Sequence, residues 1–168
     1  MKYYKRLGIF KASNVSFNSG TKEAYSYGWW KFVSKIKGEV VFNSYSYSPT
    51  TLRHQSKVRQ LMGELGIPID RYVRIKEGLQ SLRGALQPLY VRKFELEIQI
   101  SRGRANSMAQ RWRLIELLEV KEQIQWLRSL GYKFSRNDIR IVKDSIETAA
   151  IVGLLYKEAA KSEVVIDF

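Results

Sequence analysis

Apolar and polar residues alternate through the first third of the chain, which is the pattern of β-strands with one buried face. This alternation predicts three antiparallel strands: the first over 3–10 or 15–17, the second over 24–36 and the third over 40–47. Lys37-Gly38 between the last two is typical of a two-residue hairpin turn, because Gly38 accepts a positive φ. Residues 1–48 are therefore predicted to form a β-meander.

The spacing then changes to that of amphipathic helices. Ser48-Pro49 predicts a helix over 49–66, because Ser is a favoured N-cap residue, Pro suits the first helical position and Gly66 can end the helix. The segment 67–87 predicts an edge strand followed by a short connection, since Pro68 cannot donate to a strand ladder.

The remaining chain predicts a helical hairpin and a last helix over 88–161. The stretch FELEIQI (94–100) also alternates like a strand, but Pro88 before it favours a helix. Residues 162–168 (SEVVIDF) are either a final strand or a free tail. The fold class predicted is α+β, in one domain over 1–168, with a small antiparallel sheet packed with a C-terminal helical layer.

The net charge is +13 at pH 7 and is unevenly distributed. Residues 1–63 hold eleven Lys and Arg against two acidic residues, whereas the other 105 residues hold eighteen against fourteen. Such a field attracts polyanions or an acidic protein surface. With no cysteine, the chain has no disulfide or thiolate metal site, and no apolar run approaches the roughly 18 residues of a membrane-spanning helix. We expect a cytoplasmic protein without a cofactor or membrane partner.

The stretch GWWKFV (28–33) places two tryptophans side by side, and in a strand neighbouring side chains point to opposite faces. Pairing across Lys37-Gly38 predicts two faces. The face without lysine, expected to be the core, holds Trp30, Phe32 and Ile36 opposite Val41 and Tyr45. The other face holds Tyr27, Trp29, Lys31, Val33 and Lys35 opposite Val40, Phe42 and Ser44.

Two interpretations of Trp29 follow. Rings beside basic side chains form a platform on which bases stack at about 1–3 kcal/mol each while Lys and Arg neutralise phosphates. Twelve of the 21 aromatic residues precede Ser48, which supports this interpretation. Alternatively, both faces of the sheet are covered, Trp29 is packed, and the lysine stems extend outwards to water.

Two further basic segments extend the possible surface. Arg53, Lys57 and Arg59 lie on the helix over 49–66, on a face that could meet phosphates or simply water. Arg102 and Arg104 lie in the loop SRGR (101–104), another possible phosphate clamp. The candidate nucleic-acid-binding residues are thus Tyr27, Trp29, Lys31, Lys35, Lys37, Arg53, Lys57, Arg59, Arg102 and Arg104.

His54 is the single histidine, and its helical position beside Val58 and Leu61 predicts a hydrogen-bonded, half-buried role. A metal site would need further ligands of the right type, so no metal is expected. Catalysis by His54 would need a nearby nucleophile and an orienting group, as in a metal-independent nuclease. No paired-carboxylate motif, glycine-rich phosphate loop or nucleophile elbow is present, and we assign no catalytic residue.

The segments GWWKFV (28–33), VVFNSYSYSPTTLRHQSKVRQLM (40–62) and SLGYKFS (129–135) resemble a group of small proteins encoded by tailed bacteriophages. The resemblance is best over residues 24–66. It implies synthesis in the bacterial cytoplasm during infection and a task in host takeover, genome handling or counter-defence, but no activity and no functional residues.

These observations lead to three hypotheses. The first is a non-catalytic protein that binds DNA or RNA through the hairpin and the helix over 49–66. The second is an inhibitor or adaptor whose basic surface binds an acidic host or defence protein. The third is a metal-independent nuclease that uses His54.

Overall fold

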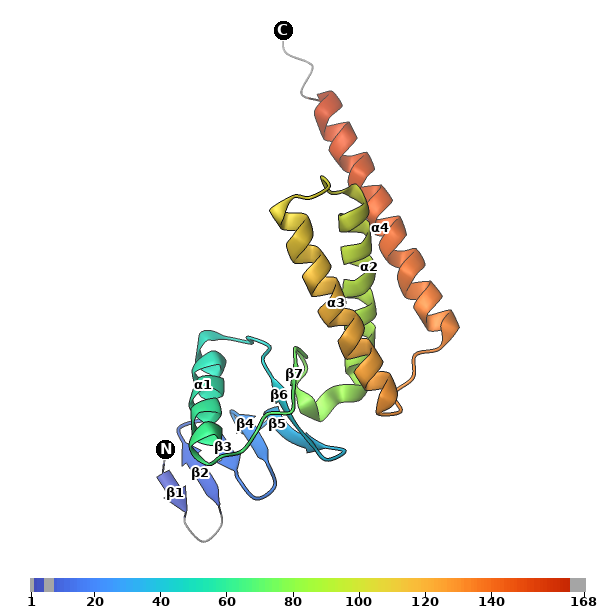
Figure 1. Ribbon diagram of the computed structural model, residues 1–168. Helices are drawn as coiled ribbons and strands as arrows, with labels where there is room; N and C mark the ends of the chain where they lie inside the picture. Colours follow the sequence, from blue (N-terminus) through green and yellow to red (C-terminus); the bar gives the residue numbers. More distant parts are fainter. Residues whose placement is uncertain (1, 5–7, 164–168) are drawn as a thin grey trace. The chain divides into compact units, whose positions relative to one another are not determined.

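The computed structural model describes residues 2–4 and 8–163 and has the predicted α+β class (Figure 1). It divides into two compact units, Met1–Ala85 (unit 1) and Leu86–Phe168 (unit 2). The strands lie in unit 1 and the long helices α2 to α4 in unit 2. A single domain over 1–168 stays a prediction, because two compact units can still belong to one folding domain.

Unit 1 contains one seven-stranded sheet whose strands are neighbours in chain order. The strands are β1 (Lys2–Tyr4), β2 (Ile9–Ala12), β3 (Val15–Asn18), β4 (Glu23–Ser26), β5 (Trp30–Ile36), β6 (Glu39–Asn43) and β7 (Arg71–Val73). All pairs are antiparallel except β6 and β7, which are parallel. The prediction of three strands was wrong in number, although 67–87 does supply an edge strand.

The single strand predicted over 24–36 is two strands separated by a tight loop. Tyr27 and Gly28 both have positive φ, at 53° and 77°, so the chain reverses there. Tyr27 is held at this left-handed position by its backbone N–H, which donates to the carbonyl of Asn14 at 2.6 Å. By contrast, the predicted hairpin turn at Lys37-Gly38 is confirmed, with φ values of 48° and 93° and the expected pairing of Val33 with Phe42.

The alternation of faces predicted for β5 is broken by a β-bulge. Ala24 pairs with Val33 and Tyr25 pairs with Lys31, so no residue of β4 stands opposite Phe32. An extra residue of this kind turns neighbouring side chains toward the same side. Val33, predicted to lie on the lysine face, is therefore fully buried together with Phe32.

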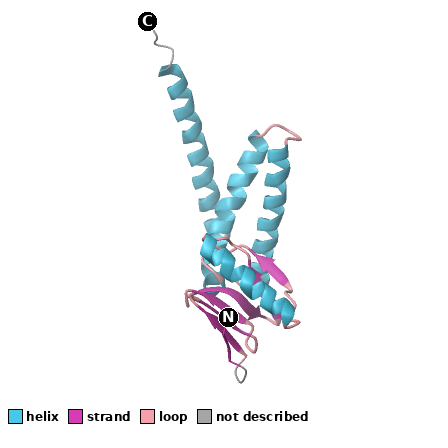
Figure 2. Cartoon of the chain, turned by 90° about the vertical axis from the view of Figure 1, so that its left-hand side faces the viewer, coloured by secondary structure: helices cyan, strands magenta, loops and turns pink. Residues whose placement is uncertain are grey.

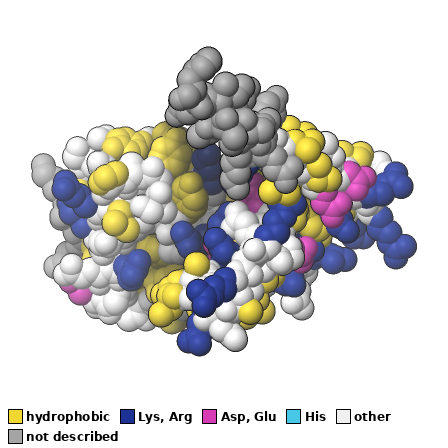
Figure 3. All heavy atoms as spheres, turned by 90° about the horizontal axis from the view of Figure 1, so that it is seen from above, with side chains coloured by type: hydrophobic (Ala, Val, Ile, Leu, Met, Phe, Trp, Pro, Cys, Tyr) yellow, Lys and Arg dark blue, Asp and Glu magenta, His cyan; other side chains and the backbone are white. Residues whose placement is uncertain are grey.

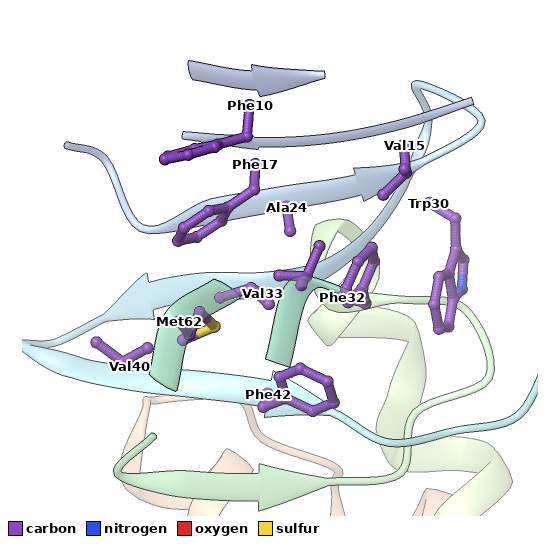
Figure 4. Packing of buried hydrophobic residues seen from close by; sticks show 11 residues of the cluster. Phe10, Val15, Phe17, Ala24, Trp30, Phe32, Val33, Val40, Phe42 and Met62 are labelled. Atoms are coloured by element: carbon purple, nitrogen blue, oxygen red, sulfur yellow. The ribbon is translucent and has the colours of Figure 1, made fainter. Parts of the chain in front are cut away.

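Helix α1 (Pro49–Glu64) covers the sheet, as Figure 2 shows. It begins as predicted: the Ser48 hydroxyl accepts the N–H of Thr51 at 3.1 Å, and Pro49 occupies the first turn. Val58 and Met62 of α1 join the aromatic core of the sheet. In Figure 4 Met62 lies among core side chains from several strands, which is how this unit closes its interior.

Unit 2 consists of α2 (Leu86–Arg102), α3 (Met108–Ser129) and α4 (Arg136–Glu163), preceded by a 3₁₀ segment over Leu79–Ala85 in unit 1. The helical interpretation of 94–100 is confirmed, because that stretch lies inside α2. Both α3 and α4 pack on α2, which lies between them in Figure 1. Of the predicted last segment, residues 164–168 lie outside the described residues.

Of the helices in the described part of the chain, none combines the length and the apolar character needed to cross a bilayer.

Candidate nucleic-acid interface

The two neighbouring tryptophans have opposite environments. Trp30 begins β5 and is 2% exposed, with its ring stacked on Phe32 and its indole N–H donating to the carbonyl of Lys76 at 3.1 Å. Trp29 ends the loop between β4 and β5 and is 55% exposed. The alternative in which Trp29 is packed is therefore wrong.

Trp29 belongs to a group of exposed rings, which we call the ring cluster: Tyr27, Trp29 and Tyr47. Tyr27 is 46% exposed and Tyr47 is 53% exposed. The rings of Trp29 and Tyr47 meet edge to face, with centroids 6.1 Å apart and planes at 86°. Three half-exposed rings from two loops thus lie on the surface of unit 1.

Buried side chains support Tyr27. The His54 ring of α1 lies 5.5 Å from the Tyr27 ring, centroid to centroid. His54 Nδ1 is in turn hydrogen-bonded to the hydroxyl of Ser26 at 2.7 Å, and both residues are buried. The predicted hydrogen-bonded role of His54 is confirmed, and its burial is deeper than expected. Tyr27 is consequently held at two points, its backbone by the hydrogen bond to Asn14 and its ring by the contact with His54.

Tyr47 is positioned by a buried polar network that fixes the loop before α1. Asn43 Oδ1 accepts the N–H groups of Tyr45 and Ile75 at 3.1 and 3.0 Å, and its amide nitrogen donates to the carbonyl of Ile75 at 2.7 Å. Gln55 of α1 donates to the carbonyls of Asn43 and Tyr45 at 2.7 and 3.0 Å. These bonds satisfy buried backbone groups where β6 ends, so the loop has a defined course.

Two cations of α1 accompany the ring cluster. Arg53 and Lys57 are exposed and lie one helical turn apart, on either side of His54 in the sequence. Burial lowers the pKa of His54, and the positive charge of Lys57 lowers it further. Two exposed cations thus flank, in the sequence of α1, the histidine whose ring contacts Tyr27.

Other predicted cations are already engaged. The Lys31 ammonium donates to the Glu23 carboxylate at 2.6 Å and lies 5.1 Å from the centre of the Tyr25 ring. The Arg59 guanidinium lies 5.1 Å from the centre of the Phe42 ring. Lys31 is thus neutralised within unit 1, and Arg59 is packed over the core instead of beside the ring cluster.

The remaining predicted cations lie elsewhere. Lys35 and Lys37 are at the opposite end of β5 from Trp29, and a strand of that length spans about 20 Å. Arg102 and Arg104 belong to unit 2, at the end of α2 and in the loop that follows. In Figure 3, Lys and Arg side chains occupy many separate places on the face shown. These four cations therefore do not belong to the group of residues around Trp29.

Sequence reasoning missed Tyr47. The prediction extended the third strand to residue 47, but β6 ends at Asn43. The signal that could have found it is the run of alternating serines in SYSYSP, which is typical of a loop before a helix cap.

The Ser26–His54 pair has the composition of a nucleophile with its base, but it cannot serve as one. Ser26 is 0% exposed, so a substrate atom cannot approach its hydroxyl. The charged group identified near His54 is the cation Lys57, whereas a base that gains a proton is normally oriented by an acceptor. The pair therefore has a structural role under Tyr27.

This environment makes stability depend on pH. The pKa of His54 is lowered from 6.5 in the folded chain, so the unfolded chain binds the proton more tightly. The contribution of neutral His54 to stability is present above pH 6.5 and is lost as the pH falls through the lowered folded pKa. We expect the urea midpoint to decrease as the pH falls below about 6.5, and His54→Gln to reduce this decrease. Equal decreases of the urea midpoint in the unaltered protein and in His54→Gln would contradict the assignment of this pH dependence to His54.

A shallow pocket on β2 to β4 has a volume of about 210 Å³ and is lined by Ile9, Lys11, Ser16, Phe17, Asn18, Thr21, Glu23 and Tyr25. Small-molecule sites usually exceed about 300 Å³. Within the described residues, no group of three His, Asp or Glu side chains could hold a metal ion.

No protein-family model, curated protein or solved structure matches this chain. The resemblance to proteins of tailed phages stays a prediction.

Proposed function

We propose that this protein binds nucleic acid without catalysing a reaction, through the ring cluster together with Arg53 and Lys57. The observation that carries the proposal is the exposure of Trp29, whose ring meets the exposed ring of Tyr47 edge to face. Each exposed ring offers a base a stacking surface worth about 1–3 kcal/mol, while Arg and Lys neutralise the phosphates. In the phage context that the sequence resemblance implies, such a protein would act on nucleic acid during infection.

The charge of the chain supports the same function. The excess of Lys and Arg over acidic residues is concentrated in residues 1–63, which carry the ring cluster and α1. A field of this sign raises the association rate with any polyanion, and an acidic protein surface is attracted in the same way, so local contacts must discriminate between the two partners. Of the three hypotheses, the nuclease has no supporting observation, because the hydroxyl hydrogen-bonded to His54 is buried.

Charge reversal tests the proposal. In the double variant Arg53→Glu and Lys57→Glu, we expect weaker binding of DNA and RNA and a salt dependence that falls by about 0.7–0.9 in log Kd per log salt for each lost phosphate contact. Fluorescence anisotropy with labelled oligonucleotides, titrated at several salt concentrations, measures both quantities.

The matched control is Lys133→Glu with Arg136→Glu, which changes the net charge equally at two exposed residues of unit 2. The control should retain the salt dependence of the unaltered protein, since only total charge has changed. Equal losses in the two double variants would show that binding follows net charge, and the proposed site would be rejected.

A second candidate is the adaptor, favoured by one observation in unit 2. The first turns of α3 expose Met108, Trp112 and Ile115, with Met108 67% and Trp112 63% exposed. Aliphatic side chains such as Met108 and Ile115 gain binding free energy by packing against an apolar protein surface, whereas they offer no ring for a base to stack on. Trp, Met and Arg are enriched in protein interfaces.

The cations beside this apolar face are Arg102, Arg104, Arg111 and Arg113, and no acidic residue occurs between Ile98 and Ile115. Elsewhere in unit 2 cations pair with carboxylates, as Arg92 does with Glu116 at 2.7 Å. The partner would therefore be an acidic, apolar segment of another protein. A protein that ignores DNA and RNA at low salt but binds such a segment would favour this candidate over the first.

A further inference from the structure

The ring cluster offers ring faces, not merely apolar area. Trp29 and Tyr47 meet at 86°, so they are not stacked on each other, and each is more than half exposed. An edge-to-face pair leaves ring faces uncovered, and an uncovered face is what a planar ligand stacks on. The cluster can thus receive a flat aromatic group without first separating its own rings.

The rings are also held in place before any ligand arrives. Tyr47 lies 6.2 Å from the buried ring of Trp30, and Tyr27 lies 5.5 Å from His54. Between Tyr27 and Trp29, a Cβ added to Gly28 would meet nothing within 4 Å, so the loop is open on that side. Preorganised rings next to open space reduce the entropy lost on binding.

The faces of bases are accessible only where they are unpaired and unstacked. In a duplex each base is covered above and below by its neighbours, so protruding rings gain nothing unless the duplex is opened. Tight duplex binding through phosphates alone draws on many cations, of the order of 6–10 contacts in strongly salt-dependent proteins, whereas α1 offers two exposed cations, Arg53 and Lys57, around the histidine that contacts Tyr27. Three exposed rings with two cations therefore suit a short stretch of single-stranded nucleic acid better than a duplex.

Resting on the proposed function, we infer that the ring cluster binds the unpaired bases of single-stranded nucleic acid in preference to duplex. Trp29 and Tyr47 stack on bases, Tyr27 borders them, and Arg53 and Lys57 contact the phosphates of the same strand.

The fluorescence of Trp29 provides a direct test. Of the four tryptophans, Trp30 and Trp126 are buried, so Trp112→Phe leaves Trp29 as the exposed one. In this full-length background we would titrate unlabelled dT15, rU15, a hairpin duplex of equal phosphate number and heparin. We expect dT15 or rU15 to quench the fluorescence and to bind at least about 10-fold more tightly than the duplex, because only they offer free bases. Heparin, which has no bases, should not quench.

The second measurement uses Trp29→Ala in the chain that is otherwise unaltered, with oligonucleotide binding followed by anisotropy. Loss of one stacked base should weaken binding of dT15 by about 5- to 150-fold, the equivalent of 1–3 kcal/mol. Trp29→Phe should recover most of the affinity, because it retains a ring. Tyr47→Ala provides an independent second variant, and circular dichroism spectra check that each variant is folded.

The outcomes separate the two levels of the proposal. Equal affinity for duplex and single strands, or quenching that is the same with heparin, would overturn the inference while leaving nucleic-acid binding in place. Unchanged affinity in both Trp29→Ala and Tyr47→Ala would also overturn it. Failure of every oligonucleotide to bind at low salt would instead reject the proposed function itself.

Discussion

Trp30→Ala is expected to destabilise unit 1 by about 3–5 kcal/mol, which is the usual cost of truncating a large buried aromatic residue. Trp30 is 2% exposed, its ring centroid lies 5.8 Å from that of Phe32, and its indole N–H bonds to the carbonyl of Lys76. The substitution leaves a cavity and removes the donor for that carbonyl. Since natural domains have about 5–15 kcal/mol of stability, such a loss is a large share of the total.

The adjacent residue is the matched control. Trp29→Ala removes the same side chain from an exposed position and should change the free energy of unfolding by about 0.5 kcal/mol or less. Urea unfolding, monitored through the hydrogen exchange of backbone amides in β5 and α1, measures the stability of unit 1 separately from that of unit 2. Similar losses for both substitutions would mean that Trp29 is packed in solution.

Asn43→Ala is expected to destabilise unit 1 by about 2–5 kcal/mol. Asn43 is fully buried and bonds to the N–H groups of Tyr45 and Ile75 and to the carbonyl of Ile75. Without its amide these backbone groups lose their partners; the two groups of Ile75 lie in a buried site, where each unsatisfied group costs about 1–3 kcal/mol, and that of Tyr45 is partly buried. Because the network also directs the loop that carries Tyr47, binding of single strands should weaken as well.

Asn18 provides the comparison for this prediction. Its side-chain oxygen also accepts two backbone N–H groups, those of Gly20 and Thr21 at 2.9 and 3.2 Å, but in an exposed turn. Water can replace these bonds, so Asn18→Ala should cost only about 0.5–1 kcal/mol. Urea unfolding of the two variants compares them, and equal losses would contradict the role of burial.

The elements that could be predicted from the sequence are those set by local chemistry. Ser48-Pro49 supplies a cap and a preset φ, and Lys37-Gly38 supplies the two positive φ values of a hairpin turn. Pro88, together with the helical spacing of apolar residues, identified 94–100 as helix. In each case the decisive interaction lies within a few residues of the signal.

The number of strands and the faces of β5 could not be predicted in this way. The reversal at Tyr27 depends on a hydrogen bond to Asn14, which is remote in sequence. The bulge at Phe32 depends on the register between β4 and β5. Strand pairing is decided by partners, so a residue's own neighbours do not reveal it.

For the candidate site, the sequence alone determined the ingredients: adjacent tryptophans, an excess of Lys and Arg in the first 63 residues, and an α1 that begins at Ser48-Pro49. Only the tertiary structure decided that Trp29 is exposed, that Tyr47 lies beside it and that Glu23 neutralises Lys31. The physical reason is that exposure and charge pairing depend on which distant segments fold against a side chain, and residue type and spacing leave that choice open.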